Sequence, residues 1–178
     1  DLCGHREIRR KIKTILITFG GSDPLNLTPR ILEKFTNCYA NLKKIVILGP
    51  AFSHKAEIEK MTDDNTVIYR NVEAEVMRDL MLASDLAISA AGQTINELAI
   101  TGLPSVIFKV AENQGNNIAG WKNIGFVDDF IDQQKYINRT LTMIDFIRSS
   151  TAKGLLIVDE DAFQGMSREQ IVDEYVRL

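Results

Sequence analysis

The segment from Ser89 to Pro104 contains the residues whose types and spacing are best suited to chemistry. An apolar run, Leu86 to Ser89, leads into a loop of small residues, and that loop opens directly onto a predicted short helix. Small residues let a ligand approach the backbone closely, and the unpaired N–H groups at a helix start attract an anion. The segment is therefore a candidate phosphate site.

Thr94 and Glu97 in this segment have two interpretations. Their spacing, T-x-x-E, is that of a capping box, which needs no ligand. In the functional interpretation, Thr94 and neighbouring amides hold a phosphate while Glu97 accepts hydrogen bonds from sugar hydroxyls, as acidic residues do for ribose in dinucleotide-binding folds. The pattern alone leaves both interpretations open.

A second small-residue loop, Gly20-Gly21-Ser22-Asp23-Pro24, follows the apolar run Thr14–Phe19. It is either a tight strand-to-helix turn or part of a ligand site. The loop lacks both the dinucleotide pattern G-x-G-x-x-G and the P-loop lysine, so a nicotinamide cofactor or ATP hydrolysis has no direct support. No cofactor is predicted.

A third polar cluster follows the apolar run Ser105–Val110, and it is interpreted either as a solvated loop or as a set of hydrogen-bonding groups for a sugar. Its members are Glu112, Asn113, Gln114, Asn116 and Asn117.

The elements that must position these loops are strands alternating with helices. The predicted strands are Thr14–Phe19, Lys44–Leu48, Thr66–Tyr69, Leu86–Ser89, Ser105–Val110 and, more weakly, Gly125–Val127. Several are almost continuously apolar, which is typical of parallel strands covered on both faces. The alternation predicts an α/β fold with a doubly wound parallel sheet, which is a Rossmann-like arrangement.

Helical spacing of apolar residues indicates the intervening helices. Thr28 is expected to cap the first and Pro29 to start it. The residues expected on buried helix faces are Ile31, Leu32, Phe35 and Cys38, then Val76, Met77, Leu80 and Met81 near Glu73–Ala83, then Ile118, Trp121 and Ile124 after Gln114. Two further helices are predicted near the C-terminus, one with Ile137, Leu141 and Ile144, the other with Ile171, Val172, Tyr175 and Val176.

Ligands of doubly wound sheets bind beyond the carboxyl ends of the strands, where the strand order reverses. In the common order 3-2-1-4-5-6 this point lies between strands one and four. The loops after those two strands are the ones that combine glycine with hydroxyl groups. Their expected proximity is stronger evidence for a site than either loop alone.

Length and composition indicate one domain, here residues 14–178, preceded by a linker or truncated end at 1–13. A net charge of −3 gives no general attraction to nucleic acid, and no apolar run approaches the roughly 18 residues of a membrane span. The lack of a signal peptide favours a cytoplasmic location. The start at Asp1, without methionine, suggests the cut end of a longer protein.

The remaining reactive residue types form no catalytic set. Cys3 and Cys38 lack the spacing of a zinc or redox motif, and His5 and His54 lie away from the small-residue loops. Neither a nucleophile with its base nor a metal cluster can be assembled, so the sequence predicts binding rather than catalysis.

The chain resembles the C-terminal half of GT-B glycosyltransferase-like enzymes through Ile15–Pro24, Met77–Asp85, and Ser89–Pro104 followed by Glu112-Asn113-Gln114. The branch it most resembles is the UDP-sugar hydrolase of pseudaminic acid biosynthesis with its spore-coat polysaccharide relatives. The transferase that adds N-acetylglucosamine in peptidoglycan lipid synthesis is more distant. Transferases often carry two glutamines where this chain has only Gln114, which favours the hydrolase branch.

The resemblance implies a UDP-sugar as ligand, in surface polysaccharide or flagellin-sugar biosynthesis. Gly20, Gly21 and Ser22 would face the diphosphate and the reacting sugar, and the uracil would lie against Val72 to Met77. The phosphates would rest on Gly92, Gln93 and Thr94, and Glu97 would hold the ribose. The other expected substrate-binding residues are Asn96, Asn113 and Gln114.

The essential histidine of the hydrolase branch belongs to an N-terminal half of the enzyme, which is the expected partner of this chain. The fragment should therefore bind UDP-sugar and turn nothing over alone. Two alternatives remain: the donor-binding half of a transferase, or a non-catalytic docking subunit that uses an apolar face around Ile171 and Tyr175. A receiver domain is disfavoured because strand one ends in Phe19-Gly20-Gly21 and not in acidic residues.

Overall fold

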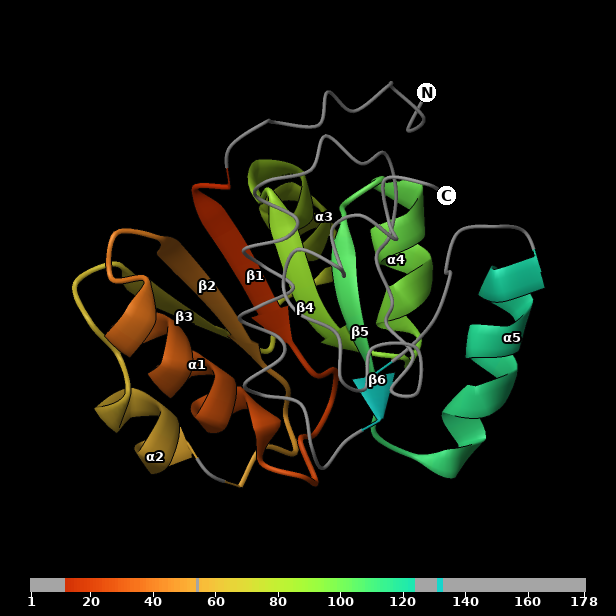
Figure 1. Ribbon diagram of the computed structural model, residues 1–178, viewed down its shortest axis with the longest axis horizontal. Coiled ribbons are helices and arrows are strands. Elements are labelled where there is room, and N and C mark those ends of the chain that lie inside the picture. The colour runs from red at the N-terminus through yellow and green to blue at the C-terminus, as the bar shows by residue number, and fades with distance from the viewer. Residues whose placement is uncertain (1–11, 54, 124–130, 133–178) are drawn as a thin grey trace, which may run out of the picture.

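The computed structural model describes residues 12–53, 55–123 and 131–132 of the protein (Figure 1). Its centre is a parallel sheet of six strands in the order β3-β2-β1-β4-β5-β6. The strands are β1 (Thr14–Thr18), β2 (Lys43–Leu48), β3 (Thr66–Arg70), β4 (Leu86–Ala90), β5 (Ser105–Lys109) and the two-residue β6 (Ile131–Asp132). The order reverses between β1 and β4, as the sequence predicted.

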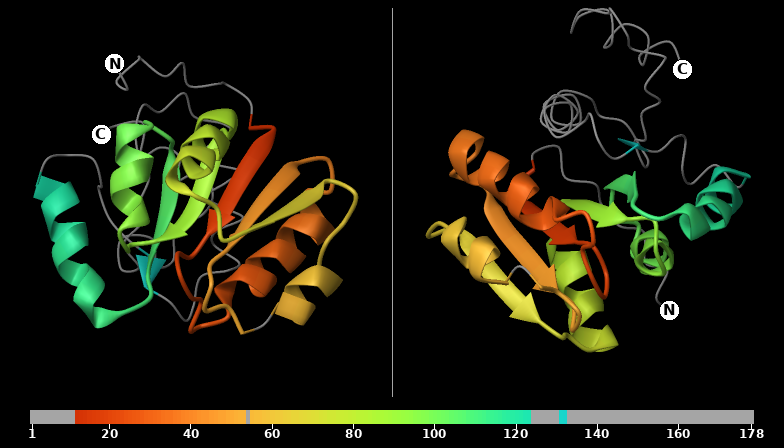
Figure 2. Two further views of the ribbon diagram at one scale, coloured as in Figure 1. Left: turned by 180° about the vertical axis from the view of Figure 1, so that it is seen from behind. Right: turned by 90° about the horizontal axis from the view of Figure 1, so that it is seen from below.

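Helices cover both faces of the sheet, which confirms the doubly wound α/β class (Figures 1 and 2). The helices α1 (Leu27–Cys38) and α2 (Lys55–Lys60) pack on one face. On the other face lie α3 (Ala74–Ala83) and α4 (Thr94–Ile100). A 3-10 turn, η1 (Glu112–Gln114), leads from β5 into α5 (Gly115–Asn123). None of the helices in the described residues is long and apolar enough to cross a bilayer.

Alternate side chains along each strand enter the two cores, because neighbouring residues of a strand point to opposite faces. In β1, Ile15 and Ile17 pack with α1 and α2, whereas Leu16 packs with α3 and α4. The residues Ile15, Leu16 and Ile17 have no exposed area. This double burial explains the continuous apolar runs seen in the sequence.

Three helix predictions are wrong in detail. Cys38 is exposed at the end of α1 and does not pack in the core. Val76 is 43% exposed, so the buried face of α3 is narrower than its apolar spacing suggests; Met81 is its only fully buried residue. Thr28 does not cap α1: the N-cap position is Asn26. The predicted strand 125–127, Ile124 and the two C-terminal helices lie outside the described residues.

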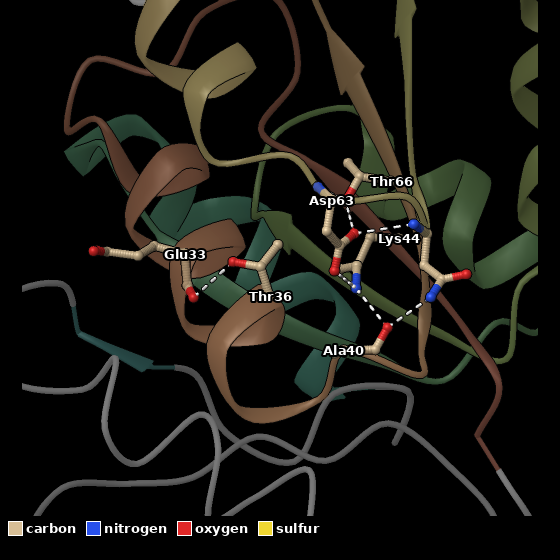
Figure 3. A network of polar contacts seen from close by, with 7 residues as sticks. Glu33, Thr36, Ala40, Lys44, Asp63 and Thr66 are labelled. Carbon is tan, nitrogen blue, oxygen red and sulfur yellow. Dashed lines mark hydrogen bonds and ion pairs between the residues drawn. The ribbon is translucent and has the colours of Figure 1, made fainter.

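The amino-terminal edge of the sheet is closed by a network of polar contacts around Lys44 (Figure 3). The Lys44 side chain is fully buried, and its Nζ donates to Asp63 Oδ2 at 2.8 Å and to the Ala40 carbonyl at 3.3 Å. Asp63 Oδ1 accepts from the Thr66 hydroxyl at 2.6 Å. Desolvation raises the pKa of Asp63, but the hydrogen bonds from Lys44 and Thr66 and the Lys44 charge outweigh it, so the pKa is lowered overall.

Candidate functional site

The loop after β1 exposes its backbone at the carboxyl-terminal edge, the lower edge of the sheet in Figure 1. Gly20 has a φ of +77°, a conformation that L side chains rarely adopt, so glycine is required there. A Cβ placed on Gly20 or Gly21 would meet no atom of the described residues within 4 Å, and Ser22 is exposed. A ligand can therefore approach this turn directly.

Asp23 in the same loop is buried, and its carboxylate takes over the role that the sequence assigned to Thr28. Its Oδ1 accepts from the Leu27 amide at 3.0 Å, and its Oδ2 accepts from the Thr28 amide at 2.6 Å. An internal anion thus occupies the start of α1. This helix terminus has no free capacity for a phosphate, which leaves the turn at Gly20–Ser22 as the open part of the loop.

The loop after β4 differs because no side chain caps the helix that follows it. Gln93 occupies the N-cap position of α4 and forms no side-chain cap hydrogen bond. The amides of Ile95 and Asn96 donate to the carbonyls of Gly92 and Gln93. Within the described part of the chain, the amides of Gly92, Gln93 and Thr94 have no such partner. These are the groups that could bind an anion.

The capping-box interpretation of Thr94 and Glu97 is wrong, because Thr94 is the first residue of α4 and not its cap. The Glu97 side chain is exposed on α4, three residues further along the helix. Partial desolvation raises the pKa of its carboxyl above the ordinary value. Asn96 instead donates from Nδ2 to Gln93 Oε1 at 3.1 Å, so these two candidate residues contact each other.

The segment after β5 lies against the β4 loop. Asn117 Nδ2 donates to the Ala91 carbonyl at 3.2 Å, a link that sequence reasoning missed because Asn117 belonged to an undifferentiated polar run. Gln114 Oε1 accepts from the Val110 amide at 2.8 Å, and its Nε2 lies 4.0 Å from a Cβ built on Gly92. The structure therefore brings Gln114 and Gly92 together, while Asn113 is exposed beside them in η1.

The three loops share one edge because their strands are neighbours. Thr18 pairs with Ser89, and Ala90 pairs with Phe108, so the ends of β1, β4 and β5 lie in register. Phe19 and Phe108 pack edge to face beneath this edge, with ring centroids 5.9 Å apart. In the expected uracil region, Val72 and Met77 are partly buried against the α3–α4 core, whereas Val76 between them is 43% exposed.

The described residues offer no metal centre, since no three histidine, cysteine or acidic side chains gather there. His5 and His54 lie outside the described residues. Two carboxylates at this edge are paired, Asp23 with the start of α1 and Glu112 with Lys109. The edge also presents backbone amides, amide side chains and the Glu97 carboxylate. Such groups bind a polar, anionic ligand by hydrogen bonds.

The chain belongs to the DUF354 family, a family of proteins of unknown function, whose model matches residues 21–166. It is 35% identical over 114 residues to an uncharacterized protein of Methanocaldococcus jannaschii. It is 36% identical over 109 residues to a Helicobacter pylori protein named pseudaminic acid cytidylyltransferase and UDP-2,4-diacetamido-2,4,6-trideoxy-beta-L-altropyranose hydrolase. Each match covers 61% of this chain, but only 23% and 19% of the relatives, so the matched part is about a fifth of their length.

Two solved structures share the fold. MurG of Acinetobacter baumannii has a TM-score of 0.59 at 19% identity, with 97% of this chain and 52% of that chain covered. A mutant of TarM from S. aureus, solved with Fondaparinux, alpha-GlcNAc-glycerol and UDP, has a TM-score of 0.55 at 15% identity; 96% of this chain and 37% of that chain are covered. At these identities the likeness shows the fold alone, a Rossmann-like half of a GT-B fold.

Proposed function

We propose that this chain is the donor-binding half of a GT-B-type glycosyltransferase that uses a UDP-sugar. The observation that carries the proposal is the row of open amides and polar side chains where β1, β4 and β5 end. A carboxyl-terminal edge at the reversal of strand order is where doubly wound sheets bind nucleotides. The GT-B fold and the UDP in the TarM structure support the choice of donor.

In this proposal the β4 loop binds the diphosphate. The amides of Gly92, Gln93 and Thr94 would donate to phosphate oxygens and stabilise the charge that develops on UDP as it leaves. Glu97 would accept from the ribose hydroxyls. Gly20, Gly21 and Ser22 would face the diphosphate and sugar, and Asn113 and Nε2 of Gln114 would contact the sugar. Asn96 would act through Gln93, whose amide oxygen it binds.

The group that attacks the donor sugar would be supplied or bound by an N-terminal half, since the described residues contain no nucleophile–base pair suited to the reaction. In a transferase this half would hold the acceptor. The proposed location of the assembled enzyme is the cytoplasm, where activated sugars are used. The docking-subunit alternative depends on Ile171 and Tyr175, which lie outside the described residues.

A UDP-sugar hydrolase is the second candidate, and the H. pylori relative supports it, because a hydrolase of a UDP-sugar is part of that protein's name. The two candidates use the same donor site and differ in the group that attacks the sugar. Release of UDP from the donor by the chain joined to its N-terminal half, without any acceptor, would identify the hydrolase. Release that requires an added acceptor would identify the transferase.

Calorimetry with UDP tests the donor site itself. We expect Glu97→Ala to weaken UDP binding about tenfold, or about 1.4 kcal/mol, because the ribose loses a charged acceptor. Glu33→Ala is the matched control, since it removes an exposed carboxylate of α1 on the other side of the sheet. Equal affinities for all three proteins, or no binding of UDP at millimolar concentration, would contradict the proposal.

A further inference from the structure

The loop after β2 supports the back of the β1 turn, and this contact has no counterpart in the sequence pattern. Gly49 directly follows β2 and is buried. A Cβ on Gly49 would lie 2.4 Å from the Gly20 carbonyl oxygen and 2.6 Å from both the Cα and the carbonyl oxygen of Gly21. All three atoms are backbone, so no side-chain rotation could relieve the overlap.

A hydrogen bond joins the same two loops. The Ala51 amide donates to the Gly21 carbonyl at 3.0 Å, which fixes the orientation of the peptide that follows Gly21. The β2 loop is itself held, because the Asn71 amide donates to the Leu48 carbonyl at 3.0 Å and Phe52 is buried in the α1–α2 core. The support behind the β1 turn is therefore rigidly attached to the sheet.

The front and the back of the β1 turn differ sharply. Among the described residues, no atom lies within 4 Å of a Cβ placed on Gly20 or Gly21, whereas a Cβ placed on Gly49 would overlap the backbone of both residues from behind. Gly49 does not have a positive φ, so glycine is not required there by the backbone conformation. Its lack of a side chain instead allows the β2 loop to approach the β1 turn closely. Any residue larger than glycine at position 49 therefore requires the backbone of one of the two loops to shift, and the attachments of the β2 loop favour movement of the β1 turn.

We propose that Gly49 is a positioning residue for nucleoside diphosphate binding: it sets the depth of the Gly20–Gly21 turn, against which the second phosphate of the donor lies. This inference rests on the proposed function, and it extends the donor site to a loop that does not touch the ligand. The expected consequence is specific. Displacing the turn should affect the phosphate that the turn faces and leave the nucleoside contacts on α4 unchanged.

The test compares the affinities of the full chain for UDP and UMP, because their ratio isolates the second phosphate. In Gly49→Ala we expect UDP affinity to fall about tenfold while UMP affinity stays within twofold. Gly120→Ala is the matched control, since a Cβ there meets nothing within 4 Å. An unchanged ratio, or equal losses for UDP and UMP, would overturn the proposal, because general destabilisation would weaken both ligands alike.

A ligand-free measurement separates this inference from the proposed function. In Gly49→Ala, the amide resonances of Gly20, Gly21 and Ser22 should shift, and those of α5 should not. If the wild type binds neither UDP nor UMP, the donor site is refuted, and with it the role of Gly49 in diphosphate binding. If the resonances nevertheless shift in Gly49→Ala, the contact between the two loops is still supported. Unshifted resonances would refute the positioning of the turn by Gly49.

Ala51→Pro provides a second variant if Gly49→Ala does not fold, because it removes the amide that donates to Gly21. We expect a smaller loss of the UDP preference over UMP, about threefold. If Ala51→Pro folds and retains the full preference, the support of the turn by the β2 loop does not influence binding, and the proposal fails.

Discussion

The amino-terminal and carboxyl-terminal edges of the sheet differ in how their polar groups are paired. At the amino-terminal edge, Lys44, Asp63 and Thr66 satisfy one another (Figure 3). At the same edge, Asp85 accepts from the amides of Lys13 and Thr14. At the carboxyl-terminal edge, the amides at the start of α4 have no acceptor among the described residues, and those residues leave open the space in front of the turn after β1. Polar groups that pair internally contribute to stability, and those left open are available to a ligand. We therefore expect the polar groups of the amino-terminal edge to stabilise the fold and those of the carboxyl-terminal edge to bind a ligand.

Asp23 is the exception to this division, because it lies at the carboxyl-terminal edge and pairs internally with the start of α1. Its carboxylate satisfies the start of α1, whereas α4 starts without a side-chain cap. The two helices that flank the reversal of strand order are thus unequal. Of these two helix starts, the one at α4 has amides without a protein acceptor among the residues that the structure describes.

The largest expected effect is that of Asp23→Ala. We expect a loss of about 3 kcal/mol in the free energy of unfolding, because two buried amides lose a charged acceptor. Urea denaturation would measure the loss. Asp23→Ser is the control, since a serine can still cap one amide and should recover part of the stability. A loss below about 1 kcal/mol in Asp23→Ala would show that water replaces the carboxylate.

Asp63→Ala should have the next largest effect, about 2 kcal/mol in the free energy of unfolding. It removes the charged partner of a buried lysine, and the cost stays below that of a fully buried pair because the Asp63 side chain is 28% exposed. Asp64→Ala, an exposed neighbour, is the matched control and should change stability little. UDP affinity should be the same in all three proteins. A change in UDP affinity for Asp63→Ala would contradict the claim that the amino-terminal edge contributes to stability and not to ligand binding.

The same ion pair predicts a dependence of stability on acid pH. The pKa of Asp63 is lower in the folded chain than its ordinary value of 3.8, so the unfolded chain binds this proton more readily. The stabilisation is complete above that value and is lost as pH falls through the lowered one. Between pH 5 and 2, unfolding free energies should therefore fall more steeply for wild type than for Asp63→Ala. Parallel pH profiles would contradict the contribution of this pair.

The smallest expected effect concerns Glu97 and the binding of uridine, which carries no phosphate. Because the pKa of Glu97 is raised above 4.5, its carboxylate should take up a proton at a higher pH than an ordinary glutamate does. We expect uridine affinity to fall about threefold from pH 6 to 4, as the charged acceptor for the ribose is lost. In Glu97→Gln the affinity should be lower but independent of pH. A pH dependence that persists in Glu97→Gln would assign it to another group.

The fold class and the loops that end at the open edge could be predicted from the sequence, and the strand order proved to be the common one of doubly wound sheets. Apolar runs such as Thr14–Thr18 fix strands buried on both faces, and alternation with helices restricts the connections to a few topologies. Those signals are local or periodic, so they can be found in one chain. They placed Gly20, Gly92 and Gln114 at one edge correctly, and the ligand contacts of these residues stay a prediction.

Only the tertiary structure decided how individual polar groups pair. The sequence could not tell that Asp23, and not Thr28, satisfies α1, or that Thr94 and Glu97 form no capping box. It gave no sign that Gly49 packs against Gly20, because the two residues lie on different loops, 29 positions apart, and meet only once β1 and β2 pair. Contacts between residues distant in sequence depend on the assembled sheet, and no periodicity along the chain encodes them.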